Sequence, residues 1–158
     1  MLEFRTVTQD ELKPVLGFLI ALQERVAMDA LPEIVAQLGW ILQTRNVGKT
    51  NLPVSLKTFL AGDLDNPAGD SELVSLDFRV TDTLPDESRA SRRLVAAVTP
   101  KMVDMVSSCL GLPPSRPLWA GPGQTWDLPN GKQVNLDQGG LFSMANMNYR
   151  IVAPLRRV

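Results

Sequence analysis

The fold is decided by the stretch Leu73-Val74-Ser75-Leu76-Asp77-Phe78-Arg79-Val80. Its even-numbered residues are all apolar, whereas three of its four odd-numbered residues are polar or charged. A repeat of two residues is typical of a β-strand that buries one face. We therefore predict a strand over residues 73–80 that turns its even-numbered side chains toward the core.

Two helices are predicted before this strand. Thr8 and Glu11 have the spacing of a capping box, and apolar residues then recur at intervals of three and four to about Met28. A shorter helix is expected to begin near Pro32 and to end at Gly39, since proline suits a first helical position and glycine a left-handed cap. Both helices would turn an apolar side toward the sheet.

A third helical region is predicted after the strand. From Leu94 to Leu110 an apolar residue recurs at every fourth position, and Gly111 follows. Pro100 removes an internal hydrogen bond, so we expect it either to kink this helix or to start a new one. The third region would cover the sheet.

Further strands are predicted around turns. A short strand is expected over residues 2–6, and two more around a turn at 46–49, one from Trp40 and one over 52–60. Residues 62–70 are rich in Gly, Pro and Asp, which predicts a surface loop. Asn130-Gly131 predicts a hairpin within 126–136, and the last strands are expected over 141–144 and 148–153.

This order of elements predicts one α+β domain over residues 1–158. Its sheet should be mostly antiparallel, with helices packed on one face, because most connections between strands are too short for parallel crossovers. No internal repeat or second domain is recognisable.

Composition excludes several classes of function. The chain has 158 residues, no histidine and one cysteine, which excludes Ser-His-Asp and Cys-His catalysis as well as zinc sites built from histidine or several thiolates. A net charge of -1 argues against nucleic-acid binding. No apolar run approaches the ~18 residues of a membrane span, so we expect a cytoplasmic protein with no bound cofactor.

Acidic residues around the predicted loop are the first candidates for a site. Asp63, Asp65, Asp70 and Glu72 could surround a hard cation, but their spacing does not fit the known calcium loop, and we predict no metal site. A solvated loop that contacts a partner is the favoured interpretation. Catalysis by a pair of carboxylates among Asp63, Asp70, Glu72, Asp77 and Asp127 remains the alternative.

Trp119 is the other candidate, because tryptophans beside a loop are common anchors of interfaces. It lies between a proline and the segment Ala120-Gly121-Pro122-Gly123. Packing into the core is the competing interpretation.

Two stretches resemble known families. Gly39-Trp40 after a helix, and the tail pattern Trp126-x-Leu128-x-x-Gly131-x-x-Val134-x-Leu136, are similar to small uncharacterised actinobacterial domains and to immunity proteins of polymorphic toxin systems. The order of elements also resembles the secretion-chaperone-like fold, whose members bind protein segments. Two helices before the sheet, Pro100 and at least one extra strand depart from that fold.

These observations together favour a non-catalytic module that binds another protein. The resemblance implies an immunity protein that blocks a toxin, with the acidic loop as its contact. Two alternatives stay open: a carboxylate-based enzyme or small-ligand binder, and a self-associating subunit or secretion-type chaperone. Self-association would use the terminal strand 148–153 as a sheet edge and would give a homodimer.

Overall fold

The computed structural model describes residues 4–22, 26–65, 71–84, 88–117, 123–129, 132–139 and 144–150. Along the chain the elements are α1 (Gln9–Ile20), β1 (Val26–Ala27), a 3-10 turn η1 (Met28–Ala30), α2 (Leu31–Leu38), β2 (Ile41–Leu42), β3 (Val47–Lys49), β4 (Thr58–Asp65), β5 (Ser71–Arg79), α3 (Arg89–Leu110), β6 (Arg116–Pro117), β7 (Gln124–Asp127), β8 (Gln133–Gly139) and β9 (Met144–Arg150).

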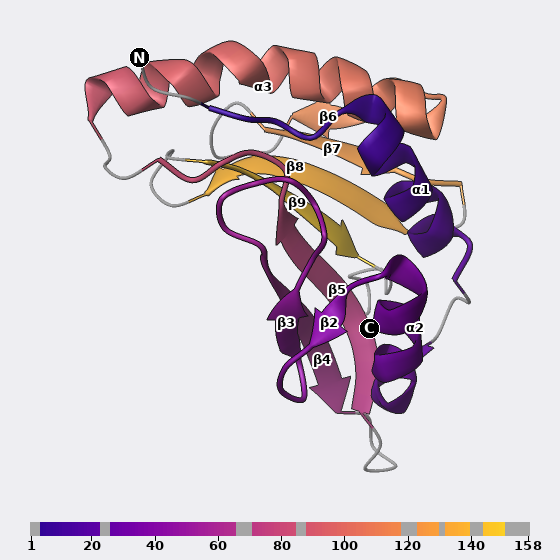
Figure 1. The fold of residues 1–158 in the computed structure, drawn as a ribbon. Helices are drawn as coiled ribbons and strands as arrows, with labels where there is room; N and C mark the ends of the chain where they lie inside the picture. Colours follow the sequence, from indigo (N-terminus) through magenta and orange to yellow (C-terminus); the bar gives the residue numbers. More distant parts are fainter. Residues whose placement is uncertain are drawn as a thin grey trace.

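The strands form one curved antiparallel sheet in the order β2-β3-β4-β5-β9-β8-β7-β6, and β1 adds to β5. Figure 1 shows α3 lying over β6, β7 and β8, with α2 beside β5 and α1 between these two helices. The predicted α+β class with a mostly antiparallel sheet is confirmed. β9 lies inside the sheet, between β5 and β8. The prediction that residues 148–150 form a sheet edge is therefore wrong, and 151–153 lie outside the described residues.

The start of α1 is confirmed but its end is not. The Thr8 hydroxyl accepts a hydrogen bond from the Glu11 N–H, and the Glu11 carboxylate accepts one from the Thr8 N–H. The helix ends at Ile20, well before the expected Met28. Val26 continues the helical spacing but pairs with Leu73 in the sheet. A tertiary strand pairing therefore overrides the local helical pattern.

The other two helices have the predicted caps. Gly39 ends α2 with φ 78°, and Gly111 ends α3 with φ 73°, both in the left-handed region that favours glycine. α3 continues through Pro100, and the Thr99 hydroxyl donates to the Val95 carbonyl at 2.7 Å. The helix is thus single. It is tied to the sheet where Trp126 donates its indole N–H to the Ser107 hydroxyl at 3.2 Å.

A β-bulge on β5 changes the predicted facing of that strand. Gly62 is opposite Ser75, but Asp63 is opposite Leu73, so Val74 is an extra residue without its own partner on β4. Leu76 and Phe78 are buried as predicted, whereas Leu73 is buried and Val74 is only half-buried. The expectation that Val74 faces the core and Leu73 does not is wrong, because the bulge shifts the alternation by one residue.

Several predicted boundaries also change. Residues 47–49, expected in a turn, form β3, and the turn lies at 43–46 instead. Residues 52–56 are not in a strand, and β4 continues through Gly62 to Asp65, where a loop was expected. Residues 4–6 contribute one isolated bridge, between Thr6 and Thr81. The hairpin of β7 and β8 is confirmed by the pairing of Trp126 with Val134.

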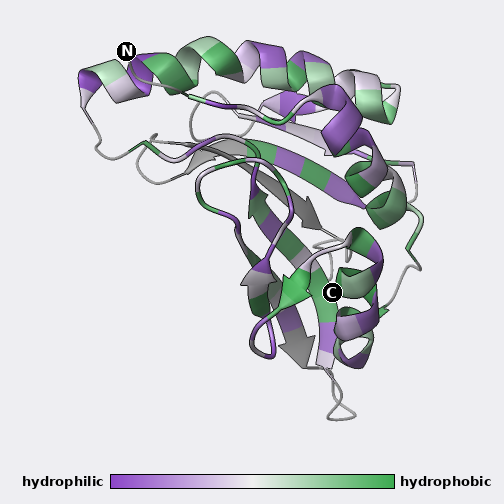
Figure 2. Ribbon diagram, in the orientation of Figure 1, coloured by the Kyte–Doolittle hydropathy of each residue, from purple (hydrophilic) through white to green (hydrophobic). Residues whose placement is uncertain are grey.

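The core lies between the helices and the inner face of the sheet. Trp40 packs against Phe59 and Phe78, with ring centroids 5.4 and 5.3 Å apart. Gly48 sits beside this cluster, where an added Cβ would overlap the Ile41 carbonyl oxygen and the Phe59 ring. Figure 2 shows hydrophobic and hydrophilic residues alternating along β8, as expected for a sheet with one face on the core.

Candidate functional site

The structure places Asp63 in a strand and gives it an ionic partner. Arg45, from the turn between β2 and β3, approaches the Asp63 carboxylate at 2.7 Å and also donates to the Ser71 hydroxyl at 3.1 Å. The Asp63 side chain is 29% exposed. Its charge is therefore compensated within the chain, which weakens it as a probe for a basic partner.

The remaining predicted site residues do not form one cluster in the described structure. Asp65 pairs with Ser71 in the sheet, and Glu72 pairs with both Leu64 and Ala27. Because Asp63 pairs with the neighbouring residue Leu73, the side chains of Asp63 and Glu72 leave opposite faces of the sheet. Asp70 and Trp119 lie outside the described residues. Contact of these residues with a partner stays a prediction.

A different surface stands out on the sheet. Among the described residues, three large apolar side chains are exposed: Ile41 at 65%, Leu60 at 45% and Leu56 at 38%. All three belong to the segment 41–60, at the end of the sheet formed by β2, β3 and β4. Single exposed apolar residues are common, whereas exposed apolar residues grouped in one region of a surface are candidates for a contact with a partner.

Strand register places four side chains of this region on one face. Ile41 is opposite Lys49 on β3, and Val47 of the same strand is opposite Leu60 on β4. Directly opposed residues in antiparallel strands point to the same face, as do residues two apart. Ile41, Val47, Lys49 and Leu60 therefore form a continuous surface, which we call the sheet-face patch.

The sheet-face patch lies on the side of the sheet opposite the core. Gly48 and Phe59, the neighbours of its residues along β3 and β4, point inward, and Phe59 is fully buried. Lys49 is exposed and has no ion-pair partner among the described residues. The patch thus combines apolar side chains with the positive charge of Lys49, and the carboxylate of Asp77, opposite Leu60 on β5, borders it on the same face. This patch could not be predicted from the sequence, because residues 46–49 have the composition of a turn.

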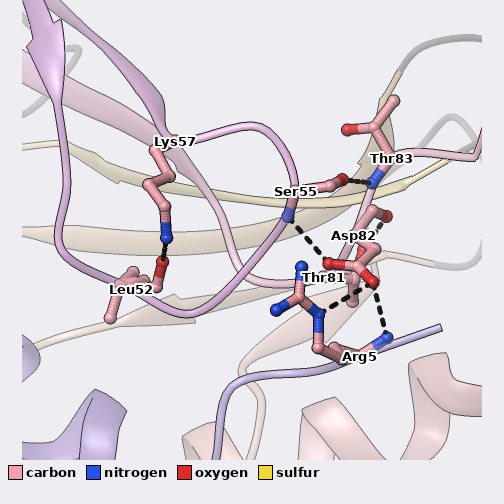
Figure 3. A network of polar contacts seen from close by, with 7 residues as sticks. All are labelled: Arg5, Leu52, Ser55, Lys57, Thr81, Asp82 and Thr83. Carbon is pink, nitrogen blue, oxygen red and sulfur yellow. Dashed lines mark hydrogen bonds and ion pairs between the residues drawn. The ribbon is translucent and has the colours of Figure 1, made fainter. Parts of the chain in front are cut away.

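The most buried carboxylate among the described residues belongs to Asp82, at 6% exposure. Figure 3 shows it accepting hydrogen bonds from the backbone N–H of Arg5 at 2.9 Å, from the Arg5 guanidinium at 3.2 Å and from the Ser55 N–H at 2.8 Å. The Ser55 hydroxyl in turn accepts from the Thr83 N–H at 2.9 Å. This network joins the N-terminal segment, the loop before β4 and the end of β5.

The hydrogen bonds around Asp82 keep its carboxylate ionised. Burial alone would raise the pKa of Asp82, but the hydrogen bonds from Arg5 and Ser55 and the positive charge of Arg5 outweigh it, so the pKa lies below its ordinary value. A general acid or base near neutrality needs the opposite shift. The structure supports a role for Asp82 in stability.

Other carboxylates considered for catalysis are distributed over the sheet. Asp77 is on β5 and Asp127 on β7, separated by β9 and β8, and the Asp127 carboxylate pairs with Arg116. Within the described ranges, no three His, Cys, Asp or Glu residues gather as metal ligands would. None of the helices in these ranges has the length and apolar character needed to cross a membrane.

The comparisons with known proteins give one match. No curated protein and no solved structure matches the chain. A family model described as a family of unknown function, DUF6301, matches residues 13–141, which run from within α1 through β8 and include most of the core. The chain therefore belongs to the family of unknown function DUF6301.

Proposed function

We propose that this chain is a non-catalytic protein-binding module that docks its partner on the sheet-face patch. The observation that carries the proposal is the exposure of Ile41 on β2 and Leu60 on β4, on one face of the sheet and on either side of β3. Covering them would remove apolar surface from water, which is the main driving force of protein association. The aromatic cluster of Trp40, Phe59 and Phe78 packs on the inner face of these strands, and a surface that is already formed loses little ordering entropy on binding.

The charge of the patch suggests the chemistry of the partner. Lys49 lies opposite Ile41 on one side and Thr58 on the other, two residues along β3 from Val47, and it has no ion-pair partner in the described structure. A complementary surface would present apolar side chains around an Asp or Glu carboxylate. Such a pair chiefly sets orientation and association rate, while the apolar contacts supply most of the affinity.

A toxin domain is the partner that we propose within this class. The support is the resemblance of the 39–40 and 126–136 stretches to immunity proteins, together with a binding surface that contains no catalytic group. An immunity protein acts by occupying its toxin, which needs a preformed complementary surface and no chemistry of its own. The proposed contact is therefore the sheet-face patch in place of the acidic residues favoured by sequence alone.

The test begins with a photo-crosslinking residue at position 41 or 60, introduced into the chain in its native cells. We expect one discrete crosslinked partner from both positions, and none from position 36, an exposed alanine of α2. The partner is then purified, and its affinity is measured by calorimetry against the wild-type chain. If it is a toxin, its activity should fall to zero at one equivalent of the chain.

A matched pair of variants separates the patch from the rest of the surface. Ile41→Asp should weaken the purified complex at least tenfold, whereas Asp104→Lys on the exposed side of α3 should not change it. Equal affinities for wild type and Ile41→Asp would overturn the proposed surface. A crosslink only to a second copy, with a dimer mass by light scattering, would replace the proposal by self-association.

A further inference from the structure

A second surface lies away from the sheet-face patch, between α1 and α2. It is a groove of about 420 Å³ whose residues come from the end of α1, β1, η1 and α2. Phe18 and Leu22 form one side, and the buried side chains of Val26 and Ile34 form the floor. Phe18 and Leu22 are only partly buried, so the groove offers apolar side chains to water. We call it the α1–α2 groove.

One rim of the α1–α2 groove is negatively charged. Glu33 and Gln37, one turn apart on α2, line it, and the Gln37 amide donates to the Glu33 carboxylate at 3.4 Å. Asp29 lies one turn before Glu33 and is exposed. Asp63, Asp82 and Asp127 are each paired with an arginine, but neither Asp29 nor Glu33 has an ion-pair partner among the described residues.

We propose that the α1–α2 groove binds a short amphipathic helix of a partner protein that carries apolar anchors and a Lys or Arg. The apolar floor would receive the anchors, and the unpaired Glu33 carboxylate would receive the cation. From Ala30 to Gln37 the groove extends over about 10 Å, which is long enough to receive two anchors that lie one turn, about 6 Å, apart on a helix. This site does not depend on the sheet-face patch and adds a second contact to the proposed function.

The probe is a fluorescent alanine-based helical peptide of about 15 residues with two leucines four positions apart and one neighbouring arginine. Binding to the full chain is followed by anisotropy, and the site is mapped by amide shifts in the NMR spectrum. We expect a Kd of about 0.1–1 mM, with the largest shifts in α1 and α2. A peptide with glutamate for the arginine should bind roughly three- to tenfold more weakly.

Two pairs of variants test the site itself. Glu33→Lys should weaken binding of the arginine peptide roughly three- to tenfold, while Asp104→Lys, an exposed acid of α3, should leave it unchanged. Ala27→Phe places a ring at the exposed β1 wall of the groove and should abolish binding, whereas Ala36→Phe on α2 lies outside the groove and should have no effect. Unchanged thermal melting of all four variants shows that they are folded.

Several results would overturn the inference. Equal binding of the arginine and glutamate peptides would show that Glu33 does not contact the cation. Failure of the arginine peptide to bind at about 1 mM would show that the groove does not bind such a helix. A dimer of the free chain that Ala27→Phe dissociates would make a second copy the occupant. Binding that appears only after the chain is cut after Arg150 would make residues 151–158 the occupant. None of these results changes what the crosslinks at positions 41 and 60 show.

Discussion

Replacement of Asp82 by asparagine should destabilise the fold at neutral pH. The carboxylate is buried and accepts three hydrogen bonds, two from Arg5 and one from the Ser55 N–H. Asparagine has nearly the same shape but only one accepting oxygen. If that oxygen accepts the hydrogen bond from the Ser55 N–H, the amide NH2 faces the two N–H donors of Arg5. Donors then face donors, and none of them has an acceptor.

The size of this effect follows from the contacts. A hydrogen bond to a charged group contributes about 1.5–3 kcal/mol, but the Arg5 side chain is 51% exposed, so water screens its share. We expect Asp82→Asn to lower the free energy of unfolding by about 2–4 kcal/mol. For a chain of 158 residues this corresponds to a fall in Tm of roughly 5–15 °C at pH 7.

The pH dependence gives a sharper test. The pKa of Asp82 in the fold lies below its ordinary value of about 3.9, so the unfolded chain takes up the proton first as the pH falls. The stabilisation is complete above about pH 5 and is lost as the pH falls through the folded pKa. Circular-dichroism melts should therefore show the gap between wild type and Asp82→Asn narrowing below about pH 4. A gap under about 1 °C at pH 7, or a gap that stays constant to pH 3, would show that the charge of Asp82 does not stabilise the fold.

Three further predictions concern single residues. Gly48→Ala should lower the free energy of unfolding in urea by about 2–3 kcal/mol, because the new Cβ meets the Ile41 carbonyl and Phe59. Gly17→Ala in α1 has open space around the new Cβ and should raise it by about 0.5–1 kcal/mol. Similar effects of the two substitutions would contradict this packing. Thr8→Ala should cost about 1 kcal/mol in thermal melts and Thr8→Ser much less, unless the capping box contributes nothing. Burial raises the pKa of the Cys109 thiol, and the charge of Lys13 partly lowers it. The midpoint of its alkylation against pH should therefore lie above the ordinary thiol value and rise further in Lys13→Gln. An ordinary midpoint would contradict the burial of the thiol.

Local signals in the sequence predicted the structure correctly where they agreed with the pairing of distant strands. The capping box at Thr8, the left-handed caps at Gly39 and Gly111 and the hairpin around Trp126 each depend on neighbours a few residues apart. Their conformations therefore follow from residue type and spacing. The same holds for Leu76 and Phe78, whose alternation lies beyond the bulge.

The errors arose where a distant strand decided the structure. Val26 fits a helix by spacing but is taken into the sheet by Leu73, and 62–65 has loop composition but pairs with β5. The bulge at Val74 has no composition signal. The sheet-face patch could not be predicted for the same reason, since only the pairing of β2, β3 and β4 brings Ile41, Val47 and Leu60 onto one face.

Binding of a partner protein to the sheet-face patch can be tested by one affinity measurement. Ile41 and Leu60 are 65% and 45% exposed, so covering both in a complex should contribute about 2 kcal/mol of apolar burial. We predict that Ile41→Asp combined with Leu60→Asp raises the Kd for the purified crosslinked partner at least 30-fold, while the variant keeps the wild-type Tm within a few degrees. A folded double variant that binds the partner as tightly as the wild type would contradict the account.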